Sequence, residues 1–497
     1  MKIKKVLIAN RGEIAVRIIR ASKEMGITAV AIYSEADANA LHVKLADEAY
    51  CVGPAAASES YLRADKILQI AKEINADAIH PGYGFLSENA DFIRMCEEAG
   101  LIFIGPSADA VVLMGEKTAA RTLMKKNNVP IVPGTTESIE DMDELKKVAE
   151  EIGYPIMLKA AAGGGGKGMR RISSPDELIE NYNRAKSEAI KAFGNGAIYL
   201  EKFIENPKHI EVQIIADKHG NYRHVFEREC SVQRRHQKVV EESPSSSVTP
   251  EVRSRITEAA INAAKACNYY NAGTIEFLMD TDKNFYFLEM NTRLQVEHPV
   301  TELVSGLDLV KEQFKIAEGE KISFEQNDLI LNGSALECRV YAEDVTNNYA
   351  PSIGKIELHR LPSGPGVRVD TGIETGSEVS VYYDPMLSKV VTWGRDRNEA
   401  INRMLNVLKE YKIAGVKTNI PLFKWILKHP KFLDGTFDIN FLDVELTPLM
   451  PDKWMEDFDN FDDVVSLIAS YLRKKDRMLK VTPNKISAEN KWVESDG

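Results

Sequence analysis

The first hundred residues alternate between short apolar runs and stretches of helical periodicity, and this alternation restricts the fold more than any other feature of the chain. The runs and amphipathic stretches follow one another at 6–9, 13–24, 28–33, 61–74, 78–80 and 102–105. Strands that alternate with helices pair in parallel, because each helix carries the chain back across the sheet. The sequence therefore predicts an N-terminal α/β domain. Only Gly12 follows the first run, so the glycine spacing of a dinucleotide-binding turn is absent and an NAD site is rejected.

Length and composition set the class of protein. Domains usually hold roughly 100 to 200 residues, so we expect this chain of 497 residues to form two to four packed units. No apolar run approaches the roughly 18 residues of a membrane span, and the short apolar run near the start is soon followed by charges, unlike a signal peptide. Five scattered cysteines without a C-x-x-C pair favour a cytoplasmic protein. The net charge of −11 disfavours nucleic acid as a partner, so an anionic substrate needs a local basic pocket.

Four consecutive glycines, Gly163, Gly164, Gly165 and Gly166, lie between a predicted strand that ends in Lys159 and another strand that begins near Met169. Each glycine costs roughly 0.5 to 1 kcal/mol relative to alanine in a regular element, so a compensating benefit is expected. Backbone N–H groups without neighbouring Cβ atoms can converge on phosphate oxygens, and the flanking lysines add charge. A flexible linker is the alternative, although a linker is unusual between two strands.

Two better-known glycine motifs fail at this loop. A strand rather than a helix follows Gly168, which argues against a Rossmann site, and Gly168 also replaces the Ser/Thr that would hold magnesium in a P-loop. The remaining interpretation is a glycine hairpin that covers a nucleotide.

The segments 274–279 and 285–291 read as an antiparallel hairpin joined by residues 280–284. If Asp280 pairs with Phe285, the register places Glu276 directly opposite Glu289, and Asn291 shares their face. The other face then carries apolar side chains suited to a core: Ile275, Phe277, Met279, Tyr286, Leu288 and Met290. Opposed carboxylates are destabilising without a proton or cation between them, and Glu, Glu and Asn oxygens suit magnesium. The alternative is a pair of solvated surface glutamates.

The segment 291–299 combines an anion-binding group with a proton acceptor. Arg293 offers a planar fork for a carboxylate-like anion, Gln295 offers a neutral donor, and Glu297 offers a carboxylate that can take a proton. The alternative is a loop in which Arg293 and Glu297 merely pair. The basic run at 227–238 would ordinarily be a solvated face, and His209 taken alone would be an ordinary packed histidine.

Several segments together resemble biotin carboxylases: Ala9–Ala15, His80–Asn89, Gly163–Gly168, Glu229–Arg235 and Glu289–Pro299. The resemblance covers about residues 1–447 and implies an α/β protein of the ATP-grasp fold. Its parts would be a Rossmann-like N-terminal domain, an ATP-grasp domain with a mobile glycine-rich lid at about 131–203, a biotin carboxylase C-terminal domain and a C-terminal extension. The implied bounds are 1–115, 116–330, 331–447 and 448–497.

The resemblance also implies site residues. The residues that would contact ATP are Lys117, Lys159, the four glycines Gly163 to Gly166, Glu201, His209, Gln233 and His236. Magnesium or manganese would be held by Glu276, Glu289 and Asn291. Bicarbonate would be bound by Lys238, Arg293, Gln295 and the amide of Val296. Glu297 looks like the general base, Arg339 resembles an arginine that stabilises charge on the ureido oxygen of biotin, and Tyr83 matches a residue near biotin.

The implied reaction is the carboxylation of biotin by MgATP and bicarbonate through carboxyphosphate, the first half-reaction of pyruvate or acyl-CoA carboxylation. The Ala-Met-Lys-Met-like sequence used for biotinylation does not occur in the chain, so we expect biotin on a separate carrier protein or on a biotinylated carboxyltransferase subunit. The segment beyond Thr447 resembles the tails of two-subunit pyruvate carboxylases, and the family favours a homodimer. The sequence leaves the final carboxyl acceptor open.

Two alternatives compete with this interpretation. One is another ATP-grasp ligase, such as half of a carbamoyl-phosphate synthetase or a purine-pathway carboxylase. The other is a nucleotide-binding scaffold without activity, although Lys238, Arg293, Glu297 and Arg339 are all present.

Overall fold

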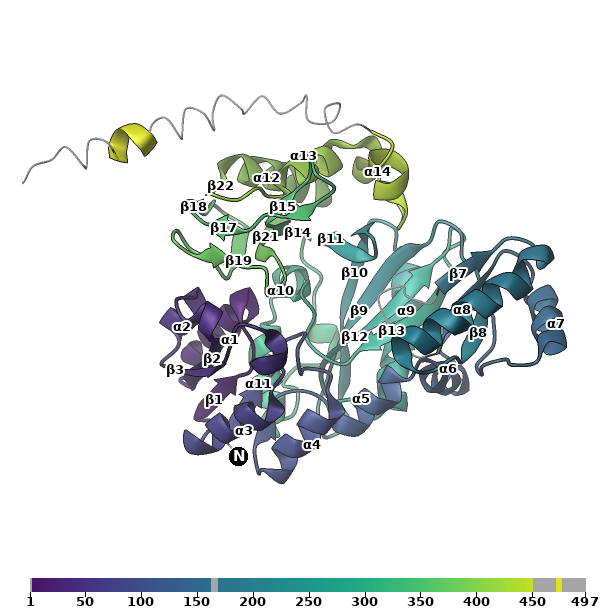
Figure 1. The fold of residues 1–497 in the computed structure, drawn as a ribbon, viewed down its shortest axis with the longest axis horizontal. Coiled ribbons are helices and arrows are strands. Elements are labelled where there is room, and N and C mark those ends of the chain that lie inside the picture. The colour runs from purple at the N-terminus through teal and green to yellow at the C-terminus, as the bar shows by residue number, and fades with distance from the viewer. Residues whose placement is uncertain (1, 162–168, 450–470, 476–497) are drawn as a thin grey trace, which may run out of the picture. The chain divides into compact units, whose positions relative to one another are not determined.

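The computed structural model describes residues 2–161, 169–449 and 471–475. The chain divides into two compact units, residues 1–448 and 449–497, and every element below belongs to the first (Figure 1). The glycines Gly163 to Gly166 lie outside the described residues.

The N-terminal part is a five-stranded parallel sheet, as the alternation of runs predicts. Its strands are β1 (Lys5–Ile8), β2 (Thr28–Ser34), β3 (Glu48–Gly53), β4 (Ala78–His80) and β5 (Ile102–Phe103), in the order β3-β2-β1-β4-β5. The intervening helices are α1 (Gly12–Glu24), α2 (Leu41–Leu45), α3 (Ala64–Glu73) and α4 (Ala90–Glu98). Alternate residues of β1 face opposite sides: Val6 and Ile8 pack in a core with α1, whereas Leu7 packs with α3 and α4. Gly12 has φ +65°, a conformation that favours glycine, where the chain turns from β1 into α1.

The next part is a small antiparallel sheet covered by helices. After α5 (Ala108–Gly115) and α6 (Lys117–Lys126), the strands β6 (Ile156–Ala160), β7 (Met169–Ile172) and β8 (Ile198–Lys202) pair in the order β7-β6-β8. The helices α7 (Met142–Ile152) and α8 (Leu178–Phe193) bury their apolar faces in the core of this sheet (Figure 1). Met157 is the partner of Glu201, so Lys159, two residues along β6, points to the same face as Glu201.

An antiparallel sheet of eight strands carries most of the remaining chain. Its order is β13-β12-β9-β10-β11-β14-β21-β19, so strands far apart in sequence become neighbours. The bounds are β9 (Lys208–Ala216), β10 (Tyr222–Arg234), β11 (Gln237–Ser243), β12 (Asn271–Met279), β13 (Phe285–Asn291), β14 (Ser334–Tyr341), β19 (Val367–Thr371) and β21 (Met386–Gly394). The helix α9 (Pro250–Ala266) packs its apolar face against β9 and β12.

The predicted hairpin of β12 and β13 forms, and Glu276 is the direct partner of Glu289 as expected. The rest of the predicted register is wrong, because Met279 rather than Asp280 pairs with Phe285, and Phe277 pairs with Phe287 rather than Leu288. A β-bulge with Leu288 as its extra residue separates these pairs and restores the opposition of the two glutamates.

The bulge also changes which side chains of β13 reach the core. Phe285 and Phe287 are buried beside Ile275, Phe277 and Met279, whereas the half-buried Tyr286 and Leu288 stand outside that core. The prediction that Tyr286 and Leu288 face the core is therefore wrong, because an extra residue reverses the alternation of a strand.

The remaining helices and short strands surround the end of the large sheet. The helices are α10 (His298–Ser305), α11 (Leu309–Ala317), α12 (Arg397–Glu410), α13 (Ile420–Lys428) and α14 (Pro430–Leu433). The short strands form three antiparallel pairs: β15 (Glu343–Asp344) with β16 (Ala350–Pro351), β17 (Gly354–Lys355) with β20 (Glu378–Val379), and β18 (Leu358–Arg360) with β22 (Lys412–Ala414). Across residues 2–161, 169–449 and 471–475, none of the helices combines the length and the apolar character that crossing a membrane requires.

Candidate active site

Lys238 is the centre of a cluster of three buried carboxylates. Its Nζ donates to Glu211 Oε2 at 2.5 Å, to Glu276 Oε1 at 2.8 Å and to Glu297 Oε1 at 2.6 Å. Glu211 on β9 and Glu276 on β12 are cross-strand partners, and Lys238 reaches both from β11. Burial alone would lower the pKa of Lys238, but the three carboxylates raise that pKa well above its ordinary value, so the lysine is charged.

Glu297 lies between two cations at the turn that precedes α10. Arg339 on β14 donates from Nη2 to Glu297 Oε2 at 2.9 Å, and Lys238 binds the other carboxylate oxygen. Burial would raise the pKa of Glu297, but the charges of Lys238, Arg339 and Arg228 outweigh it and hold the pKa well below the usual range. Arg293 instead contacts Glu88 at 3.3 Å and Asn291 Oδ1 at 2.8 Å. The alternative in which Arg293 and Glu297 merely pair is therefore wrong.

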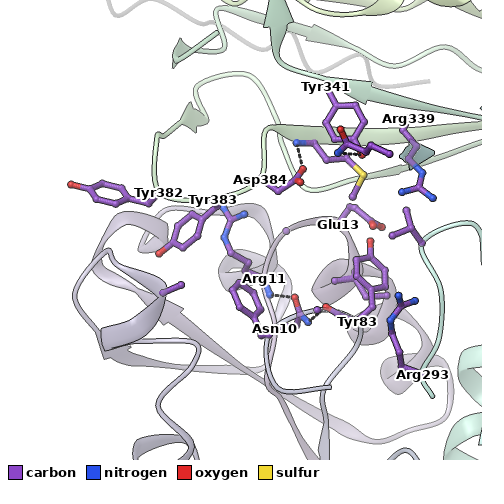
Figure 2. Close-up of a pocket in the computed structure, with 18 residues that line it drawn as sticks. Asn10, Arg11, Glu13, Tyr83, Arg293, Arg339, Tyr341, Tyr382, Tyr383 and Asp384 are labelled. Atoms are coloured by element: carbon purple, nitrogen blue, oxygen red, sulfur yellow. Dashed lines mark hydrogen bonds between the residues drawn. The ribbon is translucent and has the colours of Figure 1, made fainter. Parts of the chain in front are cut away.

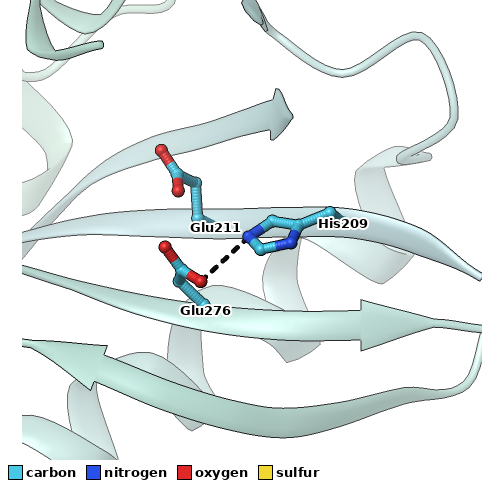
Figure 3. Close-up of side chains that lie close together, drawn as sticks. All are labelled: His209, Glu211 and Glu276. Carbon is cyan, nitrogen blue, oxygen red and sulfur yellow. Dashed lines mark ion pairs between the residues drawn. The ribbon is translucent and has the colours of Figure 1, made fainter. Parts of the chain in front are cut away.

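The two opposed glutamates differ in their surroundings. Glu276 is buried and lies 3.0 Å from His209 Nε2 (Figure 3), and it accepts hydrogen bonds from Asn291 and Gln295 at 2.8 Å each. Glu289 is exposed and has no ion pair within the part of the chain that the structure describes. Although part of the Glu289 side chain is exposed, the surrounding protein desolvates its carboxyl group, and this desolvation and the charge of Glu276 raise the pKa of Glu289. The solvated-surface alternative therefore holds for Glu289 alone.

The residues predicted to contact ATP fall into two groups. Glu201 forms ion pairs with Lys159 and with Arg121, all three buried, while the ammonium of Lys117 has its pKa lowered by burial. In the second group, Gln233 Nε2 lies 3.1 Å from His209 Nδ1. His236 is exposed in the turn between β10 and β11, where no hydrogen bond or ion pair among the described residues joins it to either group.

Three residues of the cluster were missed by the sequence analysis: Glu211, Arg228 and Glu241. Arg228 is fully buried; it pairs with Glu211 and donates to Gln295 Oε1 at 2.5 Å. Arg339 donates from Nε to Glu241 at 2.5 Å. The interpretation of 227–238 as a solvated face is wrong for Arg228 and right for Arg235 and His236 at the turn. The sequence of β9 could have indicated Glu211, because polar residues at 209, 211 and 213 alternate with aliphatic residues and so share one face of the strand.

A cavity of about 520 Å³ adjoins this cluster. Tyr83, Arg293, Val296 and Arg339 all line it, together with Asn10, Arg11 and Glu13 from the N-terminal part and Tyr341, Tyr382, Tyr383 and Asp384 from the C-terminal part (Figure 2). Two of the residues predicted to bind bicarbonate, Arg293 and Val296, therefore line the same cavity as Tyr83 and Arg339, whereas Lys238 and Gln295 do not line it. The ring of Tyr83 is half-buried, and its buried hydroxyl has no hydrogen-bond partner among the described residues.

Comparisons with known proteins agree with this arrangement. Family models match three successive parts of the chain: the N-terminal domain of biotin carboxylase at residues 2–111, the ATP-binding domain of the carbamoyl-phosphate synthase L chain at 116–325, and the C-terminal domain of biotin carboxylase at 337–444. The fold is that of an ATP-grasp ligase.

Similar proteins show which family of ATP-grasp ligases the chain belongs to. Biotin carboxylase 1 of Bacillus subtilis is 52% identical over 89% of this chain and 98% of its own length, and a subunit of the pyruvate carboxylase of Methanothermobacter thermautotrophicus is 51% identical over 88% and 89%. Among solved structures, the biotin carboxylase domain of the Hydrogenobacter thermophilus 2-oxoglutarate carboxylase, a dimer with MgADP, ADP and bicarbonate, has a TM-score of 0.84 at 50% identity and covers 89% of this chain and 98% of its own. Biotin carboxylase of Campylobacter jejuni has a TM-score of 0.86 at 48% identity, covering 89% and 99%. The chain belongs to the biotin carboxylase family.

Proposed function

We propose that this chain uses MgATP and bicarbonate to carboxylate biotin that is attached to a separate polypeptide. The observation that carries the proposal is the position of Glu297, a buried carboxylate held between Lys238 and Arg339. Arg339 and the neighbouring Val296 line a cavity large enough for a small ligand. Relatives of this chain are named as biotin carboxylases or as subunits of pyruvate and 2-oxoglutarate carboxylases, which supports the same activity.

Bicarbonate binding is proposed for Lys238, Arg293, Gln295 and the amide of Val296. A carboxylate whose pKa is held low by two cations is a weak base, so Glu297 needs its partners to turn towards another anion before it accepts a proton. Bicarbonate supplies that anion. When Lys238 and Arg339 share their charge with it, the pKa of Glu297 rises and the carboxylate takes the bicarbonate proton. The resulting oxyanion then attacks the γ-phosphorus of ATP.

The residues proposed to hold magnesium or manganese are Glu276, Glu289 and Asn291. Their oxygens suit a hard divalent cation, and a cation held by these residues would lower the raised pKa of Glu289. When bound, the metal neutralises charge on the transferred phosphoryl group. The protein keeps Glu276 ionised through Lys238 and His209, so one ligand of the pair is charged before nucleotide binds.

ATP binding is proposed for the two groups of side chains described above and for the exposed His236, with Gly163, Gly164, Gly165 and Gly166 as the cover. The side chains are Lys117, Lys159, Glu201, His209, Gln233 and His236. Glu201 pairs with both Lys159 and Arg121, so neither cation is buried without a partner, and the excess positive charge of the three groups is available to a phosphate.

The cavity beside Arg339 is the proposed site of biotin. Phosphate released from carboxyphosphate takes the proton from N1 of biotin, N1 attacks the carbon dioxide that is set free, and Arg339 stabilises the negative charge that develops on the ureido oxygen. Tyr83 supplies an aromatic wall for the ring. The carrier is proposed to be a biotin carboxyl carrier protein or a biotinylated carboxyltransferase subunit in the cytoplasm, and the chain is proposed to form a homodimer, as its relative does in the solved structure. The proposed domain bounds are 1–115, 116–330, 331–447 and 448–497.

The test is ATP hydrolysis by the purified chain with bicarbonate and free biotin. Release of phosphate that requires bicarbonate and increases with free biotin is the expected result. Stimulation by an amine in place of biotin would instead favour another ATP-grasp ligase, and no stimulated hydrolysis would favour a nucleotide-binding scaffold.

A further inference from the structure

Lys389 is a buried lysine to which the proposed reaction gives no role. It lies on β21, its side chain has no exposed surface, and it is not among the residues that line the cavity beside Arg339. Burying an ammonium group costs several kcal/mol unless close partners compensate for it. Its partners therefore show what the lysine does.

Two partners lie close to the ammonium group. Lys389 Nζ donates to the carbonyl oxygen of Val296 at 2.8 Å and lies 3.2 Å from Glu13 Oε2. Asp370 is farther away, at 4.0 Å, and is already bound by both nitrogens of the Arg368 fork at 2.9 and 2.7 Å. Glu13 is the carboxylate nearest to the ammonium group, so it acts as the charge partner of Lys389 (Figure 2 shows Glu13 on the cavity wall near Tyr83). The single directed bond of Lys389 goes to Val296.

Val296 lies in a turn that belongs to no helix or strand. The carbonyl oxygen before it, that of Gln295, accepts from the backbone N–H of His298 at 3.3 Å and lies 2.8 Å from His298 Nδ1. The next carbonyl oxygen is the one that Lys389 holds. Because a peptide unit is planar, a fixed carbonyl also fixes the N–H of the same unit. His298 therefore sets the direction of the Val296 amide, and Lys389 sets the peptide from which Glu297 extends.

We infer that Lys389 is a positioning residue for bicarbonate activation, which it serves by holding the turn of Gln295, Val296 and Glu297 in place. The inference rests on the proposed function, because that function assigns bicarbonate binding to the Val296 amide and proton transfer to the Glu297 carboxylate. The three contacting residues come from α1, the turn before α10 and β21. The geometry of the turn thus depends on the N-terminal part and the C-terminal part being packed against each other.

The test compares Lys389→Met, which keeps the length of the side chain without its charge, with Lys389→Arg, which keeps a charged donor. We expect Lys389→Met to raise the KM for bicarbonate and lower kcat by at least about tenfold, as loss of a bond from a charged donor implies. The KM for ATP stays within about twofold of the wild type, and Lys389→Arg recovers part of the loss. Equal changes in both KM values, or a bicarbonate KM within about twofold of the wild type, would overturn the inference.

Lys208 provides a matched control. Like Lys389 it donates to a backbone carbonyl, that of Gly435 at 2.8 Å, and pairs with a carboxylate, that of Glu229 at 2.9 Å, but it does not touch the turn. Lys208→Met should leave the bicarbonate KM within about twofold of the wild type. If Lys389→Met does not fold, the variant Glu13→Gln tests the inference in its place. A rise of at least about threefold in its KM for bicarbonate supports the inference, and no rise overturns it. A wild-type chain without bicarbonate-dependent hydrolysis would instead refute the proposed function.

Discussion

Glu276 and Glu289 are direct cross-strand partners on β12 and β13, yet Glu276 is surrounded by Lys238 and His209 while Glu289 has no cation bound to it in the described structure. The pair is therefore electrostatically incomplete on one side. A divalent ion would complete it.

Glu289→Gln should raise the concentration of free Mg²⁺ needed for half-maximal ATP hydrolysis by at least about tenfold, since one charged oxygen ligand is lost. The same change should leave the melting temperature of the metal-free protein unchanged or higher, because it removes a like charge opposite Glu276. Magnesium titrations of activity and thermal melts without nucleotide measure the two effects. Glu357→Gln, at an exposed carboxylate outside the site, is the control. An unaltered magnesium requirement would remove Glu289 from the proposed metal site.

Arg339→Ser should reduce biotin carboxylation far more than ATP binding. Arg339 contacts Glu297 and Glu241 but none of the side chains proposed for ATP. An electrostatic donor of this kind contributes roughly 2.7 to 4 kcal/mol, so kcat should fall by about a hundredfold or more. Carboxylation of free biotin and the KM for ATP are measured on the same preparation. Equal losses in both quantities would contradict the proposed role.

Arg228→Met should destabilise the protein by about 3–5 kcal/mol, because it leaves Glu211 buried with one of its two cations removed. Arg235→Met, in the same basic run, should change stability by less than about 0.5 kcal/mol, since Arg235 is exposed. Urea denaturation of both variants distinguishes the buried arginine from the exposed one. Similar midpoints for the two variants would contradict the burial of Arg228.

Acid should destabilise the protein in part through His80. Burial lowers the pKa of His80 to about 3, while an unfolded histidine titrates near its ordinary value of 6.5. The unfolded state therefore binds the extra proton first, and the stability that neutral His80 contributes is complete above pH 6.5 and is lost as the pH falls from there towards 3. At pH 5 the loss amounts to about 2 kcal/mol.

His80→Asn isolates this effect, since its side-chain oxygen can accept the Gly82 N–H that His80 Nδ1 now accepts at 3.1 Å. The difference in unfolding free energy between pH 7 and pH 5 should be about 2 kcal/mol smaller than in the wild type. Comparing differences within each protein removes the packing loss of the smaller side chain. Identical pH dependence in both proteins would show that His80 is not the group responsible.

The parallel N-terminal sheet follows from the sequence, because it depends on local periodicity. The predicted opposition of Glu276 and Glu289 is confirmed, but the register that predicted it is not, because the Leu288 bulge compensates for a turn shifted by one residue. Contacts between residues that are far apart in the chain cannot be predicted in this way. The burial of Arg228 arises because β10 is covered on its site face by Gln295 and Thr301, about seventy residues later, as its hydrogen bonds to both show. Lys389 looks like an ordinary polar residue of a strand until β21 is placed beside the turn at Val296. The Leu288 bulge has no signal in the apolar pattern, since either register offers an apolar face.

That bulge has a consequence for how tolerant the hairpin is to change. Because the extra residue sits between the turn at 280–284 and Glu289, the acidic pair takes its alignment from the upstream pairs Thr274–Asn291 and Ile275–Met290. Residues inserted in the turn at 280–284 would therefore change the turn and the bulge without changing the pairing of Glu276 with Glu289. The turn is thus a place where a tag or a reporter peptide can be grafted without disturbing the chemistry a few residues away.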